Sequence, residues 1–140
     1  MKIDIGCGER PQPGYDVYTD VRQPKASIPG KFYETPMESM PMFSSKQFDY
    51  AWCHHVIEHT QEPTKALNEL QRIAKRGQIN FPSIQIELLA GRSDHRWYVC
   101  EDHGRLLIIR KRLGAWQRSV KALQDCKFEW EDTIPFEVVT

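Results

Sequence analysis

Two glycines and an acid near the start of the chain have the types and spacing of a nucleoside-binding site. In the segment DIGCGERPQPG, Gly6 and Gly8 directly follow a short apolar run, and Asp20 ends the next such run. Glycine tolerates positive φ and carries no side chain, so a Gly-x-Gly turn lets the backbone approach a ligand closely. A carboxylate has two acceptor oxygens and can bind both hydroxyls of a ribose. These residues predict a cradle for a nucleoside-type ligand.

A second group of chemically capable residues is the stretch HHVIEH at 54–59. On a helix, His55, Glu58 and His59 would fall at i, i+3 and i+4, on the one face that a metal needs. H-x-x-E-H is also the zinc signature of the inverzincin peptidases, so a metal-dependent hydrolase is kept as a last alternative. A histidine is equally a natural general base, for which His55 is the first candidate and His95 the second. Ordinary roles as hydrogen-bonded loop histidines fit both residues as well.

The elements that must position these residues follow from short apolar or alternating segments. Strands are expected at 2–5, 15–20, 31–35, 48–54 and 78–83, with weaker ones at 105–109 and 136–139 and a helix at 114–125. At 140 residues the chain is long enough for one domain with a buried core, which we expect to cover 1–140.

The clearest helix is expected from 63 to 76. Pro63 suits the first helical position, and five apolar residues at helical spacing form one face: Ala66, Leu67, Leu70, Ile73 and Ala74. Lys75 and Arg76 then stand before Gly77, which we expect to end the helix.

This order of strands and helix predicts an open α/β sheet, in which ligands bind beyond the carboxyl ends of the strands. The unusual residues all fall at such ends: Gly6 and Gly8, Asp20, Met37 and Glu38, and His54 and His55. A helix normally follows the glycine turn, but only 11 residues separate Gly8 from Asp20, and Pro11, Pro13 and Gly14 are among them. Because proline inside a helix costs about 3 kcal/mol, we expect this helix to be reduced to a loop.

Taken together, the motifs resemble those of the class I S-adenosylmethionine-dependent methyltransferases, especially the type 11-like group with an H-V-L-E-H stretch. The stretches that carry the resemblance lie between residues 2 and 83: IDIGCG, Asp20, ESMPM, FDYAWCHHVIEH and PTKALNELQRIAKRGQINFP. The resemblance implies a Rossmann-like open sheet in a minimal form, with the first helix reduced and no N-terminal lid. It also implies S-adenosyl-L-methionine as cofactor, S-adenosyl-L-homocysteine as product, and a methyltransferase acting on an unidentified acceptor, with O or N favoured over C.

The same resemblance implies which residues bind the cofactor. They are Asp4, Gly6, Cys7, Gly8, Arg10, Asp20, Val21, Met37, Glu38, His54 and His55. The turn at 6–8 would lie under the methionine end, Asp20 on the ribose, Met37 and Glu38 beside the adenine, and the two histidines where the methyl group leaves. Arg10 stands where the family has a third glycine, and we expect it to supply the positive charge that the missing helix would have offered to the methionine carboxylate.

The resemblance also bears on a metal. Some methyltransferases acting on ribose hydroxyls of RNA ends or on catechol-like intermediates carry E-x-x-E-H here and bind a divalent cation. This chain has His55 in place of the first Glu, and imidazole favours softer metals than magnesium. Most relatives with His at this place need no metal, so we assign none and leave open a site at His55, Glu58 and His59.

Charge and cysteine content bear on partners and location. With 19 basic and 19 acidic residues the net charge is zero, so no overall field favours nucleic acid or an anionic membrane. Six basic residues and Trp116 between 105 and 121 keep RNA as a partner that is not favoured. The four cysteines are irregularly spaced and the first residues form a strand, so reduced thiols and a cytoplasmic protein without a membrane segment are expected.

Little of the chain is left to contact the acceptor. Residues 84–104 alone are expected to do so, with an open acceptor side or one completed by a second copy in a homodimer. The alternative to an enzyme is a partner subunit that binds the cofactor without catalysis.

Overall fold

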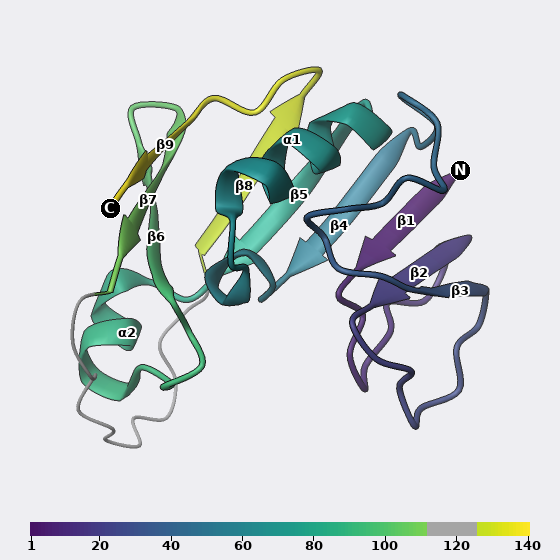
Figure 1. The fold of residues 1–140 in the computed structure, drawn as a ribbon, viewed down its shortest axis with the longest axis horizontal. Helices are drawn as coiled ribbons and strands as arrows, with labels where there is room; N and C mark the ends of the chain where they lie inside the picture. Colours follow the sequence, from purple (N-terminus) through teal and green to yellow (C-terminus); the bar gives the residue numbers. More distant parts are fainter. Residues whose placement is uncertain (112–125) are drawn as a thin grey trace.

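Residues 1–111 and 126–140, which this computed structural model describes, form two sheets (Figure 1). The larger has the order β3-β2-β1-β4-β5-β8, in which the first five strands are parallel and β8 is antiparallel. Its strands are β1 (Lys2–Ile5), β2 (Val17–Asp20), β3 (Lys31–Glu34), β4 (Tyr50–His54), β5 (Arg76–Phe81) and β8 (Cys126–Glu131). The five strands expected between residues 2 and 83 and the open α/β sheet are confirmed, with β2 beginning at Val17 and β5 at Arg76.

The register of the parallel strands brings their carboxyl ends together. Ile5 pairs with Thr19 of β2 and with Cys53 of β4, and Cys53 pairs with Ile79 of β5. The glycine turn, Asp20 and the histidine pair therefore leave the sheet along one edge, as expected for a site in an open α/β sheet.

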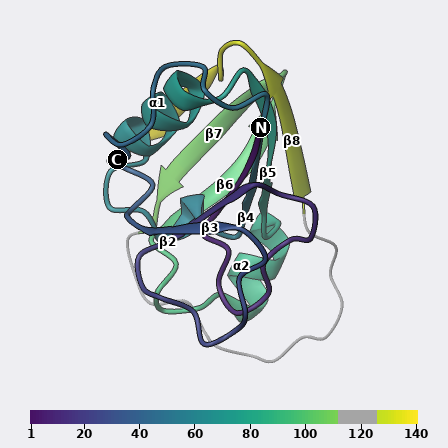
Figure 2. The ribbon, with the colours of Figure 1, turned by 90° about the vertical axis from the view of Figure 1, so that its right-hand side faces the viewer.

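One face of the large sheet packs against the helix α1 (Pro63–Ile73), as the views from the front and the side show (Figures 1 and 2). The apolar stripe of α1 is buried in one core with the alternate strand residues Ile5, Cys53, Ile79 and Phe128. Because only one side of α1 is apolar and buried, the helical spacing of its apolar residues is visible in the sequence of 63–73.

The end of α1 differs from the expectation. The helix stops at Ile73, Ala74 is extended, and β5 begins at Arg76, so Gly77 is a strand residue and does not terminate the helix. Gly77 pairs with Ala51 of β4, and a Cβ there would collide with the Ala51 carbonyl oxygen. Close packing of two strands, and not a helix cap, is what requires glycine at this position.

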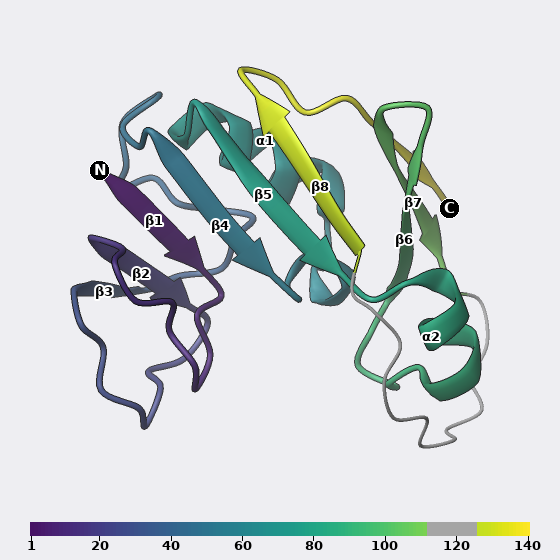
Figure 3. The same cartoon turned by 180° about the vertical axis from the view of Figure 1, so that it is seen from behind.

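The opposite face of the sheet, seen in Figure 3, has none of the described helices lying on it. Its residues are polar or amphipathic: Asp4, Trp52, Gln78 and Glu129 form one row across four strands. Strands of a parallel sheet are usually apolar on both faces because helices cover both. The alternating sequence of β4 and β5 matches a sheet that has its core on one side.

A loop takes the place of the helix expected after the glycine turn. Side chains of the first two strands hold it, because the Gln12 N–H donates to Asp4 Oδ2 (2.8 Å) and the Tyr18 hydroxyl donates to the Gln12 carbonyl (2.7 Å). Tyr18 is fully buried beneath this loop. The reduced first helix is thus confirmed for the described residues, with hydrogen bonds from strand side chains in its place.

A second sheet, of order β6-β7-β9, lies beside the β8 edge of the first (Figures 1 and 3). Its strands are β6 (Trp97–Asp102), β7 (Arg105–Arg110) and β9 (Phe136–Val139), and the helix α2 (Ile84–Ala90) precedes it. The strands expected at 105–109 and 136–139 are confirmed, whereas β6 and α2 were not foreseen. The helix expected at 114–125 lies outside the described residues.

The segment between β4 and α1 contains little regular structure. The stretch after β4 forms only a short 3-10 helix, η1 (Ile57–His59), so His55 precedes it and does not share a helical face with His59.

Among the described residues, no helix has the length and apolar character needed to cross a membrane.

Candidate functional site

The glycine turn after β1 has the backbone that glycine allows. Gly6 and Gly8 have φ values of +66° and +52°. A Cβ at Gly6 would collide with the Val56 side chain, whereas a Cβ at Gly8 would enter open space. The turn is tied to β2 because the Cys7 N–H donates to the Thr19 carbonyl (3.0 Å). The backbone at Gly8 is therefore accessible, and its lack of a side chain leaves room that a ligand could use.

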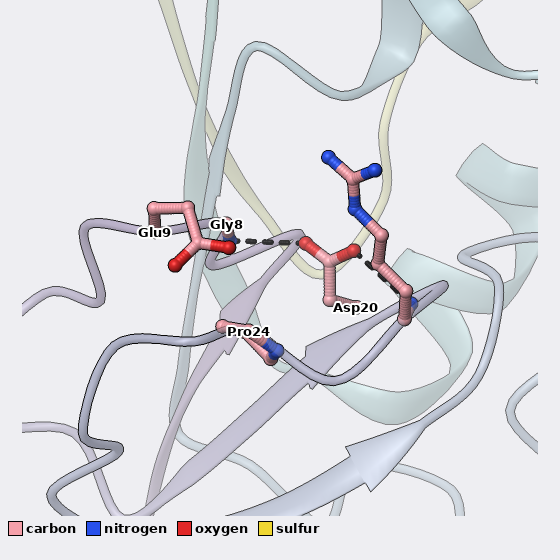
Figure 4. A pocket seen from close by; sticks show the side chains of 5 residues that line it. Gly8, Glu9, Asp20 and Pro24 are labelled. Carbon is pink, nitrogen blue, oxygen red and sulfur yellow. Dashed lines mark hydrogen bonds between the residues drawn. The ribbon is translucent and has the colours of Figure 1, made fainter.

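The carboxylate of Asp20 lies directly against this turn. Its Oδ2 accepts a hydrogen bond from the Gly8 N–H (2.9 Å) and its Oδ1 accepts one from the Arg22 N–H (3.3 Å) (Figure 4). A cavity of about 50 Å³ adjoins it, lined by Gly8, Glu9, Asp20, Arg22 and Pro24. Each carboxylate oxygen has two lone pairs, so the acid retains acceptor capacity after both backbone contacts are made. Val21, next in the chain, is 67% exposed.

Glu9 connects the glycine turn to the loop after β2. Its Oε2 accepts hydrogen bonds from the backbone N–H groups of Lys25 and Ala26, both at 3.0 Å. These bonds lower the pKa of Glu9 and keep it ionised. The neighbouring Arg10 is exposed on the same turn. Two segments that border the cavity are thus held together by one side chain.

Burial raises the pKa values of two titratable groups beneath the turn. Burial raises the pKa of Asp4 to about 6, against the effect of its hydrogen bond from Gln12 and with a further rise from the charge of Asp20. Burial and the nearby Asp4 raise the pKa of the Cys7 thiol to about 12. Cys7 is therefore a thiol, not a thiolate nucleophile, at neutral pH.

The residues after β3 are placed partly in the core. Met37 is 3% exposed, and its thioether accepts a contact from the Cys53 thiol of β4 (3.8 Å). Glu38 is half-buried and accepts a hydrogen bond from the Gln61 N–H (2.8 Å), which joins the loop after β3 to the loop after η1. Both residues lie in the loop at the carboxyl end of β3, and their roles beside an adenine remain predictions.

The two histidines at the end of β4 face different neighbours. His54 is exposed, with Nδ1 3.2 Å from Nδ2 of Asn80 on β5. His55 has a φ of +54°, unusual for a residue with a side chain, and its Nδ1 lies 3.1 Å from Oε1 of Glu58. Such backbone costs about 1–3 kcal/mol and is concentrated at functional sites. The strained turn directs the His55 ring toward a buried carboxylate.

The structure adds His95 to this region. Ligand atoms of Glu58, His59 and His95 all lie within 4.8 Å of one another. His95 is 8% exposed and its Nδ1 lies 2.5 Å from Oε1 of Glu87 on α2. Burial lowers the pKa of His59, whose ring meets that of His95 edge to face at 4.4 Å.

Sequence reasoning missed Glu87 as a site residue, and a usable signal for it was present. Ser83 caps α2 by accepting a hydrogen bond from the Ile86 N–H (3.2 Å). Serine after a strand and before an apolar run is a helix-start signal, which would have placed Glu87 on a helix. No signal in the sequence shows that this helix lies beside the loop after β4.

Comparisons with known proteins agree with this fold. The family model described as "Methyltransferase domain" matches residues 14–81, and no curated protein matches the chain. The PH0226 protein from Pyrococcus horikoshii OT3 is 16% identical with a TM-score of 0.51, over 76% of this chain and 64% of that one. A SAM-dependent methyltransferase from Methanosarcina mazei is 14% identical with a TM-score of 0.52, over 73% and 66%. The YcgJ protein from Bacillus subtilis is 21% identical with a TM-score of 0.50, over 59% and 44%.

These matches define the class of fold. The chain has the Rossmann-like fold of the class I methyltransferases, in a form with few helices among its described residues. It resembles the class I S-adenosylmethionine-dependent methyltransferases in fold and in the sequence of residues 14–81. It spans less than two thirds of the length of each of the three structures named above.

Proposed function

We propose that the chain binds S-adenosyl-L-methionine and transfers its methyl group to an oxygen or nitrogen acceptor. The observation that carries this proposal is the contact between the Gly8 N–H and the Asp20 carboxylate at the carboxyl ends of β1 and β2. The residues fit the cofactor because a Cβ at Gly8 would fill the space beside the turn and Asp20 has acceptor capacity left for a ribose diol.

The remaining cofactor contacts are proposed from the family resemblance and the order along this edge. Asp4 holds the turn, and Cys7 and Gly6 form the floor under the methionine end. Arg10, exposed on the turn, supplies a positive charge for the methionine carboxylate. Val21 borders the ribose, and Met37 and Glu38 border the adenine.

The chemistry that this chain must supply is limited. When bound, the cofactor provides a methyl group on a sulfonium sulfur that is already a strong electrophile. The residues orient the acceptor in line with the C–S bond, and one of them removes the proton that an O or N acceptor loses. His55 is our first candidate for this base because it follows β4, with His54 beside it, and His95 is the second.

Space for an acceptor is proposed beyond β5. A cavity of about 400 Å³ is lined by Ser83, Ile84, Gln85, Val99, Cys100, Glu101, Cys126 and Lys127. These residues come from α2, β6 and β8 and the segment before α2. Most of them belong to the 84–104 segment that we expect to contact the acceptor.

The decisive experiment is a calorimetric titration of the full chain with S-adenosyl-L-homocysteine. Asp20→Asn keeps the shape of the side chain and removes the charge that strengthens its hydrogen bonds, so affinity should fall about 10- to 100-fold. Asp16→Asn is the matched control, because Asp16 accepts a bond from the Lys2 N–H (2.6 Å) outside the proposed site. The control should affect stability without changing affinity, and equal affinity for wild type and Asp20→Asn would overturn the ribose assignment.

Turnover against an acceptor panel then separates the enzyme from a cofactor-binding partner subunit without catalysis. If the chain is an enzyme, His55→Gln should abolish turnover while S-adenosyl-L-homocysteine still binds, with a loss of affinity much smaller than the loss of turnover. From sequence alone we also propose that the protein is cytoplasmic and that a second copy completes its acceptor side. Nucleic acid is not the favoured acceptor.

A further inference from the structure

We propose that Glu58, His59 and His95 bind a divalent transition-metal ion, with Zn²⁺ as the best-fitting ion. The three residues come from η1 and from the segment between α2 and β6, and their ligand atoms lie within 4.8 Å of one another. Ligand atoms around a tetrahedral zinc lie roughly 3.3 Å apart, so closing the site needs small side-chain movements only. The inference is independent of S-adenosylmethionine binding.

The carboxylate of Glu58 is the first reason. Glu58 is 0% exposed, and neither of its oxygens has a hydrogen-bond partner in the part of the chain that the structure describes. Nδ1 of His55 lies 3.1 Å from Oε1 and forms an ion pair with it when protonated, which leaves Oε2 without such a contact from His55. A buried carboxylate without hydrogen bonds costs several kcal/mol, which a directly bound cation offsets.

The second reason is the arrangement behind the two imidazoles. His95 Nδ1 lies 2.5 Å from Oε1 of Glu87, and His59 Nδ1 lies 3.6 Å from Oδ2 of Asp94. Histidines that bind metals typically direct one ring N–H to a carboxylate, which fixes the tautomer and leaves the other nitrogen as the ligand. In His95, Nε2 is therefore the nitrogen available to a metal, whereas His59 only has a carboxylate near its Nδ1.

These two carboxylates are themselves held in place. Glu87 is 2% exposed and its other oxygen pairs with Lys111, whose side chain is also buried. Asp94 forms a two-point pair with Arg92, with N···O distances of 2.8 and 2.9 Å. The charges of both outer carboxylates are thus compensated by Lys111 and Arg92, so they do not by themselves require a metal.

The donor set selects the ion. Two imidazoles and one carboxylate form the ligand set of zinc sites that keep a fourth position open, and also suit iron(II). Magnesium and calcium prefer oxygen ligands at nearly every position, and only Glu58 offers oxygen here. The sequence alone led us to assign no metal and to consider His55 as a ligand, because it did not show that His95 folds against Glu58.

The test uses the full chain stripped with a chelator and titrated with zinc chloride by calorimetry. Wild type should bind one equivalent of zinc, and Glu58→Gln and His95→Asn should each weaken binding at least about 100-fold. His103→Asn is the matched control, because His103 is exposed and pairs with Asp102. Magnesium chloride should give no comparable binding.

Glu87 orients the His95 ring, so its substitution should weaken zinc binding less than loss of a ligand does. Glu87→Gln preserves the side-chain shape and should weaken zinc binding about 10- to 100-fold. Circular dichroism checks that each variant is folded. If His95→Asn does not fold, Co²⁺ added to wild type replaces it as the test: visible absorption without a thiolate charge-transfer band supports N and O ligands.

Zinc could also bind to a cysteine thiolate elsewhere in the chain, and this alternative needs its own test. Cys100 and Cys126 are half-buried free thiols, so a Cys100→Ser, Cys126→Ser double variant must retain the site. The proposal is overturned if wild type binds no stoichiometric zinc, if binding survives in Glu58→Gln, or if the double variant abolishes it.

Discussion

Buried acids determine much of the behaviour of this site at the scale of single residues. Asp4 is 2% exposed and supports the glycine turn through the Gln12 N–H. It does so with a carboxyl whose charged form is disfavoured by burial. The Asp4 side chain stabilises the turn by accepting a hydrogen bond, whereas ionisation of its carboxyl group opposes folding.

Asp4 should therefore make stability fall as pH rises. Its pKa is about 6 in the folded chain and near 3.8 when unfolded, so the folded state holds the proton more tightly. The contribution is present below about pH 4 and is lost between about pH 4 and 6, by about 3 kcal/mol in total. Asp4→Asn removes this titration while its amide oxygen can still accept from Gln12.

Urea unfolding of both forms at pH 4, 5, 6 and 7 measures the effect. The free energy of unfolding of wild type should fall relative to Asp4→Asn across this interval. Asp49→Asn is a control of opposite sign, because hydrogen bonds from Lys75 and the N-terminal amine lower the pKa of Asp49 to about 2. Parallel pH profiles for wild type and Asp4→Asn would contradict the assignment.

At the scale of elements, α1 organises the loop between β3 and β4 as well as the sheet. The Arg72 guanidinium donates to the carbonyls of Phe43 (2.7 Å) and Met40 (3.0 Å) and pairs with Glu69. Glu69 in turn accepts from the Met40 N–H (2.9 Å). A segment without regular structure is thus fixed by two side chains one helical turn apart, in the loop from which Met37 and Glu38 also come.

Replacing Arg72 by lysine should loosen that loop. Lysine keeps the charge but cannot make the forked set of bonds, so the free energy of unfolding should fall by about 1–2 kcal/mol. Amide hydrogen exchange should rise most between residues 39 and 47. Lys65→Ala on the same helix breaks an exposed pair with Glu62 and should change stability by less than about 0.5 kcal/mol. Equal effects of the two substitutions would argue against the anchor.

At the scale of the whole molecule, the two sheets share one core and meet at the segment after β4. The Trp97 indole N–H of β6 donates to the Thr60 carbonyl (2.7 Å), and the Arg96 N–H donates to the Glu58 carbonyl (2.7 Å). Trp97 is 2% exposed within the same apolar cluster as the strands of the large sheet. This junction also holds the proposed zinc ligands, so its packing positions them.

Trp97→Phe tests the junction. The change removes a buried hydrogen bond and part of an aromatic ring, which should cost about 2–4 kcal/mol. Exchange protection should fall more in β6, β7 and β9 than in β1 and β2, because the second sheet depends on this contact. Trp52→Phe on the half-buried opposite face should have a smaller effect. A uniform loss of protection throughout the chain would show that the sheets do not separate in this way.

Local chemistry in the sequence determined the first half of the fold. Apolar runs and alternation specified β1 to β5, and the spacing of Leu67 and Leu70 with their neighbours specified α1. The prolines after Gly8 specified a loop in place of a helix. The hairpin of β6 and β7 also has a local signal, since His103 and Gly104 form its turn with positive φ, but no strand is expected from sequence in the aromatic stretch before it.

Tertiary structure alone decided which chemical groups meet. His55, Glu58 and His59 are neighbours in sequence, but the buried cluster contains His95 and, behind it, Glu87. Local signals likewise predict that Gly77 ends the helix. In the structure it is a strand residue, because Ala51 of β4 packs against it. Propensity and periodicity act over a few residues, whereas these contacts depend on how separate elements pack, and a single sequence carries no direct record of that packing.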